Sequence, residues 1–395
     1  MKMLHTGDWH IGRHLNQHAL LEDQRHALGQ LLTLIRREQP DVLIVAGDLY
    51  DRALAPREAM TLVDTVLTEV VLDLAIPAIV IGGNHDGRER LDYGSAILRQ
   101  KGLHMIGTYR PIVAPILLTG KGDAAPVAFW PVPFVKPVEY RDLTGSGNIP
   151  DYNAMYREIV SDITARMNPD IPNVLVTHGL ILSDVPQEGD IDDSVRPIEI
   201  GGVSYADAGI FDAFDYVALG HLHRPQKVGS DRIRYAGSLL KYSFSEVDQK
   251  KSVTLVDLDT CNRQALPAIT AFPIEGLRDL RVIRGTFDEL TSLSAYTTPH
   301  RDDYLRVVLT DKVRVPNPME GLRQVYPNVL EMGYESSRSL DGGGRQQRIK
   351  EHLENPMTLL ADFYQAIRGE ALPEAESTLA RELFDQISED DDATA

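Results

Sequence analysis

The chain has 395 residues, of which 43% are hydrophobic and 25% charged, so we expect a globular protein of two or three domains. Its formal net charge of −18 disfavours nonspecific coating of nucleic acid, although bound divalent cations would add positive charge that this count omits. The absence of an apolar run of roughly 20 residues, the lack of a signal-peptide core and the single cysteine predict a cytoplasmic protein without a membrane association.

Strand and helix patterns alternate in the N-terminal part of the chain. Residues 2–6 and 78–81 are predicted strands, and the continuous apolar run at 42–46 is typical of a buried strand. Amphipathic patterns over about 19–37 and after Pro56 predict helices between these strands. This alternation indicates a mostly parallel α/β sheet.

Shorter strands predominate between residues 100 and 275. We expect strands near residues 103–106, 114–118, 127–132, 173–177, 216–219, 233–236 and 252–258. The last two are expected to complete a second sheet that packs against the first. A helix is predicted over 151–166. Pro131, Pro133, Pro137 and the stretch Gly145–Gly147 predict a long exposed loop, and residues 184–200 predict another.

The pattern changes beyond residue 275. Strands near 280–284 and 304–309 predict a compact strand–helix–strand unit, and Asp341–Gly344 predicts a linker. Amphipathic helices are expected over 355–368 and 374–388. The expected segments are a main domain (1–275), a small α/β domain (276–340), a linker (341–354), a helical segment (355–389) and an acidic tail (390–395).

Polar side chains follow five of the predicted strands. The candidates are Asp8, His10, Asp48, Asn84, His85, His178, His221 and His223. Sites in open α/β sheets form beyond the carboxyl ends of the strands, so we expect these side chains to converge. A mixture of carboxylates, imidazoles and an amide oxygen, with no thiolate, suits Mn²⁺, Fe or Zn²⁺ better than Ca²⁺ or a structural zinc site.

The set is too large for one ion with open positions, and it fits two ions that share a bridging carboxylate. Asp48 is the natural bridge because it lies in the middle of the set. Two metals at about 3.5–4 Å can activate a water and stabilise the attacking and leaving oxygens of an in-line displacement at phosphorus. The sequence therefore favours phosphoester hydrolysis.

Each motif taken alone has an ordinary structural explanation. Asp8-x-His10 is common as a turn with a surface histidine, Gly47-Asp48 as a helix cap, and Asn84-His85-Asp86 as a turn. The five motifs together, each at the end of a predicted strand, outweigh these explanations. The histidines assigned to packing or to the surface are His5, His14, His18, His26, His104, His300 and His352.

The motifs D-x-H, G-D, G-N-H, H and G-H-x-H resemble the calcineurin-like metallophosphoesterase superfamily. The resemblance implies a four-layer α-β-β-α sandwich with two Mn²⁺ ions, for which Mg²⁺, Fe or Zn²⁺ are alternatives. It implies one metal held by Asp8, His10, Asp48 and His223, and a second held by Asp48, Asn84, His178 and His221. It also implies that His85 is catalytic and stabilises developing charge or assists the leaving oxygen.

Further segments are similar to a bacterial DNA-nuclease branch of this superfamily. They are Gly7–Gly12, Gly47–Asp51, Phe214–Gln226, Tyr235–Ser238 and Tyr242–Glu246. The similarity implies exonuclease action on duplex ends and endonuclease action on single strands or hairpins, in DNA end processing, repair and recombination. It also implies a coiled-coil ATPase partner that binds residues 355–389, a capping and DNA-binding role for 276–340, and a homodimer within a heterotetramer. Asp51 stands where archaeal and eukaryotic members often have histidine.

Two other functions are compatible with parts of the sequence. A phosphomonoesterase or cyclic-nucleotide diesterase would use the same metal ligands, but it would not need the regions after residue 276. A non-catalytic scaffold on the same fold would typically have lost ligands, and none is missing here. Comparing the turnover of a chromogenic phosphodiester with the cutting of a DNA hairpin separates the enzymatic possibilities.

Overall fold

A computed structural model of the chain describes residues 1–121, 125–183, 205–258 and 265–335, together with Leu360, Tyr364, Pro373, Ser377 and Ala380. The chain divides into two compact units. The first comprises Met1–Val282, Thr297–Arg306 and Tyr326–Leu330. The second comprises Ile283–Tyr296, Val307–Val325 and the residues from Glu331 onward.

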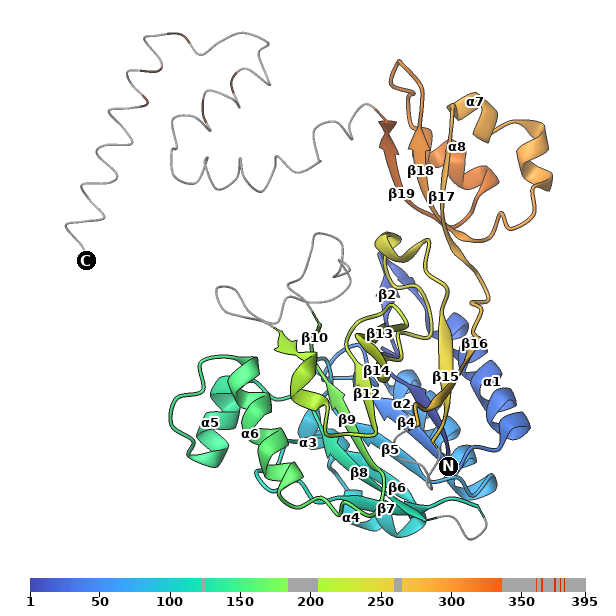
Figure 1. Cartoon of the computed structure of the whole chain (residues 1–395). Coiled ribbons are helices and arrows are strands. Elements are labelled where there is room, and N and C mark those ends of the chain that lie inside the picture. Colours follow the sequence, from blue (N-terminus) through green and yellow to red (C-terminus); the bar gives the residue numbers. More distant parts are fainter. Residues whose placement is uncertain are drawn as a thin grey trace. The chain divides into compact units, whose positions relative to one another are not determined.

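The first unit contains a six-stranded sheet with the order β16-β15-β1-β4-β5-β6 (Figure 1). Its strands are β1 (Lys2–Thr6), β4 (Val42–Ala46), β5 (Ala78–Ile81), β6 (Leu103–Ile106), β15 (Ser252–Asp257) and β16 (Ala268–Pro273). The strands β1, β4, β5 and β6 are parallel, β15 is antiparallel to β1, and β16 is antiparallel to β15. Every residue of β4 and β5 is buried, as the continuous apolar runs predict.

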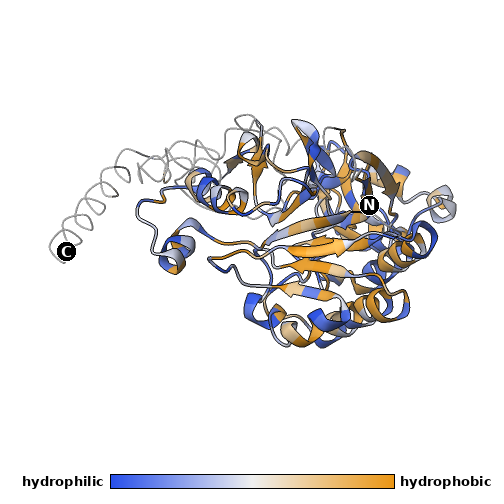
Figure 2. Ribbon diagram, turned by 60° about the horizontal axis from the view of Figure 1, so that its bottom comes forward, coloured by the Kyte–Doolittle hydropathy of each residue, from blue (hydrophilic) through white to orange (hydrophobic). Residues whose placement is uncertain are grey.

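A second six-stranded sheet has the order β13-β14-β12-β9-β8-β7. Its strands are β7 (Ile116–Thr119), β8 (Pro126–Val132), β9 (Asn173–His178), β12 (Tyr216–Gly220), β13 (Gln226–Val228) and β14 (Ser230–Tyr235). The four central strands are parallel, and β7 and β13 close the two edges in the antiparallel direction. Figure 2 shows that hydrophobic residues predominate along the strands of the sheets.

The two sheets pack face to face, and helices cover their outer faces (Figure 1). Ile44 and Ile79 of the first sheet share a fully buried core with Phe129 and Val176 of the second. The helices α1 (Leu21–Glu38) and α2 (Arg57–Thr68) pack on the other face of the first sheet, and α5 (Pro137–Thr144) and α6 (Tyr152–Thr164) pack on the other face of the second. The predicted four-layer α-β-β-α arrangement is confirmed.

Short elements connect these layers. They are β2 (His14–Leu15), β3 (His18–Ala19), the π-helical η1 (Glu69–Asp73), α3 (Arg88–Leu91), α4 (Ser95–Leu98), η2 (Arg99–Lys101), β10 (Ile181–Leu182), β11 (Ala206–Asp207), η3 (Ala208–Phe211) and η4 (Phe244–Glu246). None of the described helices is both long and apolar enough to span a bilayer.

The C-terminal part of the described chain contains a three-stranded sheet with the order β17-β18-β19. Its elements are β17 (Leu280–Gly285), α7 (Phe287–Leu290), η5 (Leu293–Thr297), β18 (Tyr304–Leu309), α8 (Pro318–Val325) and β19 (Val329–Tyr334). A capping box fixes the start of α7, because the Thr286 hydroxyl accepts the Glu289 N–H and the Glu289 carboxylate accepts the Thr286 N–H. The strands predicted near 280–284 and 304–309 are confirmed, and α8 and β19 are additional.

The exposed loop predicted from Pro131, Pro133 and Pro137 is wrong. Pro131 and Pro133 are buried, and Pro131 lies in β8. The edge strand β7 pairs with β8 only as far as Phe129, so Pro131 has a hydrogen-bonding neighbour on one side only and its missing N–H is tolerated. Pro137 opens α5, where a proline costs no intrahelical hydrogen bond. Of the predicted stretch, Gly145 ends α5 with a φ of 70°.

The predicted placement of the strand at 252–258 is also wrong. β15 belongs to the first sheet, where Leu255 pairs with Leu4 of β1, whereas β14 belongs to the second sheet as expected. Apolar patterning shows that a segment is a buried strand, but it does not show which free strand edge the segment joins.

Several predicted segments lie outside the described residues. They are the loop at 184–200, the linker at 341–354 and the acidic tail at 390–395. The helices predicted over 355–368 and 374–388 are described only at Leu360, Tyr364, Ser377 and Ala380, each of which is helical.

Candidate metal centre

The predicted polar side chains emerge from five strand ends, as the sequence indicates. Asp8 and His10 follow β1, Asp48 follows β4, and Asn84 and His85 follow β5. His178 is the last residue of β9, and the pair His221 and His223 follows β12. The structure brings all eight together, and it buries every one of them except Asn84, which is partly buried.

The loops that carry these residues have unusual backbone conformations. Asp8, His10, Asp48 and His221 all have positive φ values, of 50°, 45°, 48° and 114°. L-residues rarely adopt this region, and such strain is typical of functional sites that the surrounding structure holds in place. Gly83 is required for a different reason, because a Cβ at this position would lie 2.2 Å from Asp48 Oδ1.

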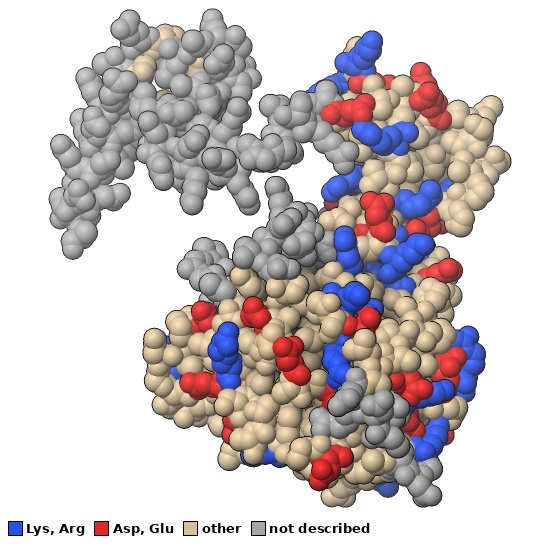
Figure 3. All heavy atoms as spheres, viewed as in Figure 1, with Lys and Arg blue, Asp and Glu red and all other residues tan. Residues whose placement is uncertain are grey.

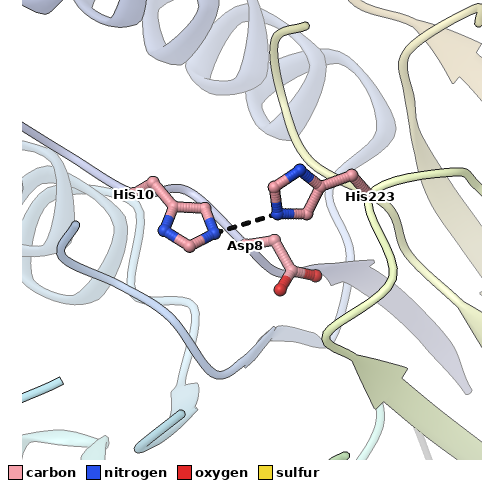
Figure 4. Close-up of side chains that lie close together, drawn as sticks. All are labelled: Asp8, His10 and His223. Atoms are coloured by element: carbon pink, nitrogen blue, oxygen red, sulfur yellow. Dashed lines mark hydrogen bonds between the residues drawn. The ribbon is translucent and has the colours of Figure 1, made fainter. Parts of the chain in front are cut away.

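One group of candidate ligands, the Asp8 group, consists of Asp8, His10 and His223 (Figure 4). The Nε2 atoms of the two histidines face each other at 3.1 Å. The Asp8 carboxylate accepts the backbone N–H of His221 at 2.9 Å, which ties the loop after β1 to the loop after β12. Burial raises the pKa of Asp8 to about 8, and the nearby Asp48 carboxylate adds to this rise.

A second group, the His178 group, consists of Asn84, His178 and His221. Asn84 Oδ1 lies 2.9 Å from His178 Nε2 and 3.2 Å from His221 Nδ1. His178 Nδ1 lies 2.9 Å from the backbone carbonyl of Ala46. Because a carbonyl only accepts, Nδ1 of His178 donates its hydrogen there and Nε2 is turned toward the group.

Asp48 lies between the two groups. Its Oδ2 atom is 3.7 Å from His10 Nε2 and 3.4 Å from His178 Nε2. Burial lowers the pKa of His178, but the Asp48 carboxylate outweighs it and raises that pKa to about 9. The location of Asp48 is the one expected of a bridging ligand.

The chemistry of this cluster fits divalent cations. Histidines must be neutral to bind a metal, and burial lowers the pKa of His10, His221 and His223. His178 is the exception, because the Asp48 carboxylate raises its pKa, and it must lose a proton when a metal binds. Among the residues that the structure describes, His221 Nε2 is buried without a hydrogen-bond partner, and two buried carboxylates lie close together. Neutral imidazoles beside paired carboxylates supply the nitrogen and oxygen ligands that Mn²⁺, Fe and Zn²⁺ accept. The site therefore supports bound divalent metals.

His85 is held in a distinct way beside these groups. Its backbone N–H donates to Asp48 Oδ1, and its Nδ1 lies 2.8 Å from the backbone carbonyl of Asp51. Its ring packs edge-on against His10 with the centroids 4.7 Å apart. The Asp51 carboxylate is paired with Arg13 at 3.1 Å. His85 thus lies next to both groups, with Nε2 as the ring nitrogen that can reach a substrate.

Asp86 has a role that the sequence did not reveal. Its buried carboxylate accepts the backbone N–H groups of Leu49, Tyr50 and Gly83, and so joins the loops after β4 and β5. Burial and the nearby Asp48 raise the pKa of Asp86 to about 6. Its place two residues after Asn84 is a signal, but the motif alone indicates only a turn.

The remaining described histidines lie outside the two groups. His5 is buried between the sheets, where its Nδ1 lies 2.9 Å from the Tyr216 hydroxyl. His14 lies near the carbonyl of Gly12, and the ring of His18 packs against Tyr304. His352 lies outside the described residues.

Two comparisons with known proteins show the family of this chain. Residues 1–225 match the family described as calcineurin-like phosphoesterase, and the SbcD subunit of the nuclease SbcCD from Staphylococcus epidermidis is 34% identical over 98% of this chain and 99% of its own length. The chain belongs to the calcineurin-like phosphoesterase family, in its SbcD branch. Residues 276–368 match a second family, described as the type 5 capsule protein repressor C-terminal domain. The resemblance of the sequence to a bacterial nuclease branch of this superfamily is confirmed, and this branch is SbcD.

Two solved structures are also similar to this SbcD-branch chain. The crystal structure of TT1561 from Thermus thermophilus is 12% identical, covers 69% of this chain and 99% of that chain, and has a TM-score of 0.39. The E. coli phosphoesterase Yfce is 17% identical, covers 69% of this chain and 99% of that chain, and has a TM-score of 0.28.

Proposed function

We propose that this protein is a Mn²⁺-dependent DNA nuclease that hydrolyses phosphodiester bonds in complex with an SbcC-type coiled-coil ATPase. The observation that carries the proposal is the convergence of seven candidate metal-ligand side chains beside His85. The similarity to an SbcCD nuclease subunit over nearly the whole chain favours DNA over a small phosphoester. The expected activities are exonuclease cleavage of duplex ends and endonuclease cleavage of single strands or hairpins.

The proposed ligands follow the two groups. One cation is held by the Asp8 group with Asp48, and the other by the His178 group with Asp48. When bound, the two cations would lower the pKa of an attacking water and neutralise the charge that develops on the phosphate. His85 Nδ1 donates to the Asp51 carbonyl, so the ring must carry a second hydrogen on Nε2 to stabilise developing charge or to give a proton to the leaving oxygen.

Access of DNA to this site is compatible with the charge of the chain. On the face of the first unit drawn in Figure 3, lysine and arginine side chains are interspersed with aspartate and glutamate. The net charge of −18 therefore does not make this face uniformly negative. A DNA backbone can approach a mixed surface of this kind when divalent cations supply positive charge at the site.

The decisive experiment compares Mn²⁺ with Mg²⁺ in cleavage of hairpin and blunt duplex DNA, with and without the ATPase partner. We expect Mn²⁺-dependent cutting of both, and faster turnover of the hairpin than of a chromogenic phosphodiester. His85→Ala should retain both cations and lose cleavage. Cutting at the wild-type rate by this variant would contradict the role of His85, and turnover of the small diester alone would contradict the nuclease.

The partner and assembly are part of the same proposal. We propose that residues 355–389 bind the ATPase with the apolar faces of two helices, that residues 276–340 cap the site and contact DNA, and that the protein forms a homodimer within a heterotetramer. The family match over residues 276–368 supports a distinct role for this region. Truncation after Gly344 should abolish co-purification with the ATPase and preserve Mn²⁺-dependent cutting of single strands. Retained co-purification would contradict the assignment.

A further inference from the structure

The segment from Tyr242 to Lys251 packs against the histidines of the Asp8 group. It contains the stretch Tyr242–Glu246, which the motifs of the site leave without a role. The Tyr242 ring packs edge-on against His10 and His223, with centroid distances of 5.5 and 5.8 Å. Its hydroxyl donates to the backbone carbonyl of Trp9, between the two ligands of the loop after β1. This segment therefore contacts candidate ligands from two strand ends.

Glu246 contacts the ring nitrogen of His223 that faces away from the Asp8 group. The Glu246 side chain is fully buried, and its Oε1 lies 3.0 Å from His223 Nδ1. A carboxylate only accepts, so Nδ1 of His223 carries the hydrogen. The lone pair of His223 is then on Nε2, the atom that faces His10 Nε2 at 3.1 Å.

Lys251 binds the other carboxylate oxygen of Glu246. Its buried ammonium donates to Glu246 Oε2 at 2.6 Å, to Gln249 Oε1 at 2.6 Å and to the backbone carbonyl of His223 at 2.8 Å. The lysine thus neutralises the carboxylate and fixes the main chain of the same histidine. Both the ring and the backbone of His223 are held by one ion pair, which a packing role alone does not require.

We propose that Glu246 is a positioning residue that orients His223 and fixes its tautomer for metal binding, with Lys251 as its counter-ion. The inference rests on the proposed function, because it assigns His223 to a cation position. Outer partners of this kind fix ring orientation and ligand basicity in metal sites, and their loss typically weakens metal binding by about 10- to 100-fold.

The test uses the full-length protein and four variants of it, each with a single substitution. Glu246→Ala removes the acceptor, and Glu246→Gln keeps the volume and one acceptor oxygen if the alanine variant does not fold. Asp248→Asn is the matched control, because it removes one exposed carboxylate from the same segment. Calorimetric titration of Mn²⁺ into the metal-free proteins measures the affinity at each position. Histidine NMR of the metal-free proteins, with His223→Asn for assignment, measures the Nδ1–H resonance of His223.

We expect wild type and Asp248→Asn to show a slowly exchanging His223 Nδ1–H resonance and two Mn²⁺ positions. Glu246→Ala should lose the resonance and bind Mn²⁺ about 10- to 100-fold more weakly at one position, with the other unchanged. Glu246→Gln should shift the resonance and weaken the same position to a smaller extent. A Glu246 variant with an unchanged resonance, or with unchanged affinity at both positions, would overturn the inference.

The two measurements separate this inference from the proposed function. If wild type binds no Mn²⁺, the proposed function fails, and the resonance alone decides whether Glu246 fixes the His223 ring. If wild type binds two Mn²⁺ ions and cuts DNA while Glu246→Ala binds them equally well, the proposed function stands and Glu246 is not a positioning residue.

Discussion

The two groups of candidate ligands are held in place by different kinds of partner. In the His178 group, Nδ1 of His178 donates to the backbone carbonyl of Ala46. In the Asp8 group, Nδ1 of His223 donates to the side chain of Glu246, which is in turn paired with Lys251. A backbone acceptor is retained under any substitution of Ala46, whereas a buried ion pair is lost with either of its members. Substitution of Glu246 or Lys251 is therefore expected to disturb the Asp8 group.

The largest effect is expected at Asp48, which lies between the two groups and belongs to neither alone. This carboxylate lies within 4 Å of a histidine from each group, so Asp48→Asn should weaken cation binding at both positions. We expect DNA cleavage to fall by roughly 10³-fold or more, beyond the effect of losing an outer partner. Mn²⁺ calorimetry and a hairpin cleavage assay measure the two effects. Loss of a single position would show that Asp48 is not shared.

Removing His221 and His223 separately tests whether the two groups bind different cations. His223→Ala removes a member of the Asp8 group, and His221→Ala removes a member of the His178 group. Each variant should therefore bind one Mn²⁺ ion in place of two, and the remaining affinity should differ between them. If both variants lost the same position, the division into two groups would be wrong.

We expect the loops after β4 and β5 to depend on Asp86 for stability. Asp86→Ala leaves two buried N–H groups and one partly buried N–H group without their acceptor, which should lower the free energy of unfolding by about 3 kcal/mol or more. Urea denaturation of the metal-free protein measures this change. Asp64→Ala, at an exposed position of α2, should stay within about 0.5 kcal/mol of wild type. An equally small effect at Asp86 would mean that its hydrogen bonds are replaced.

The smallest effect concerns Glu246 and Asp86, whose contributions to the free energy of unfolding depend on pH in opposite directions. Burial raises the pKa of Glu246, but the hydrogen bond from His223 and the charge of Lys251 outweigh it and lower the pKa from its ordinary 4.5 to about 2. The stability that Glu246 contributes is therefore fully present above about pH 4.5 and is lost as the pH falls toward 2. Asp86 has the opposite sign, because its pKa is raised from 3.8 to about 6 and its contribution falls as the pH rises between these values.

Unfolding of the metal-free protein across this pH range tests the difference. The stability advantage of wild type over Glu246→Gln should be constant between pH 5 and 7 and shrink below about pH 4.5. The advantage over Asp86→Asn should decrease as the pH rises from about 4 to 6. Parallel curves for the two variants would contradict the distinct roles of the two carboxylates.

Much of the fold follows from local patterns in the sequence. The buried runs at β4 and β5 are short, continuous and apolar, and β1, β9 and β12 each contain a short apolar core, so the strand character of these segments does not depend on distant residues. Each run ends at a polar motif, and this placed the eight candidate site residues before any tertiary information. The errors arose at Pro131, Pro137 and β15, where the strand neighbours and the start of a helix decide the outcome.

The sequence by itself determined the identity of the strands, the residues at their ends and the family to which the chain belongs. Only the tertiary structure decided which side chains meet. His10 and His223 are separated by 213 positions, and their contact depends on the packing of two sheets. The same is true of Asp86, which joins two loops through backbone N–H groups, and of Glu246, which reaches His223 from a later segment. Hydrogen-bond partners of this kind are fixed by proximity in the folded chain, which periodicity and spacing do not encode.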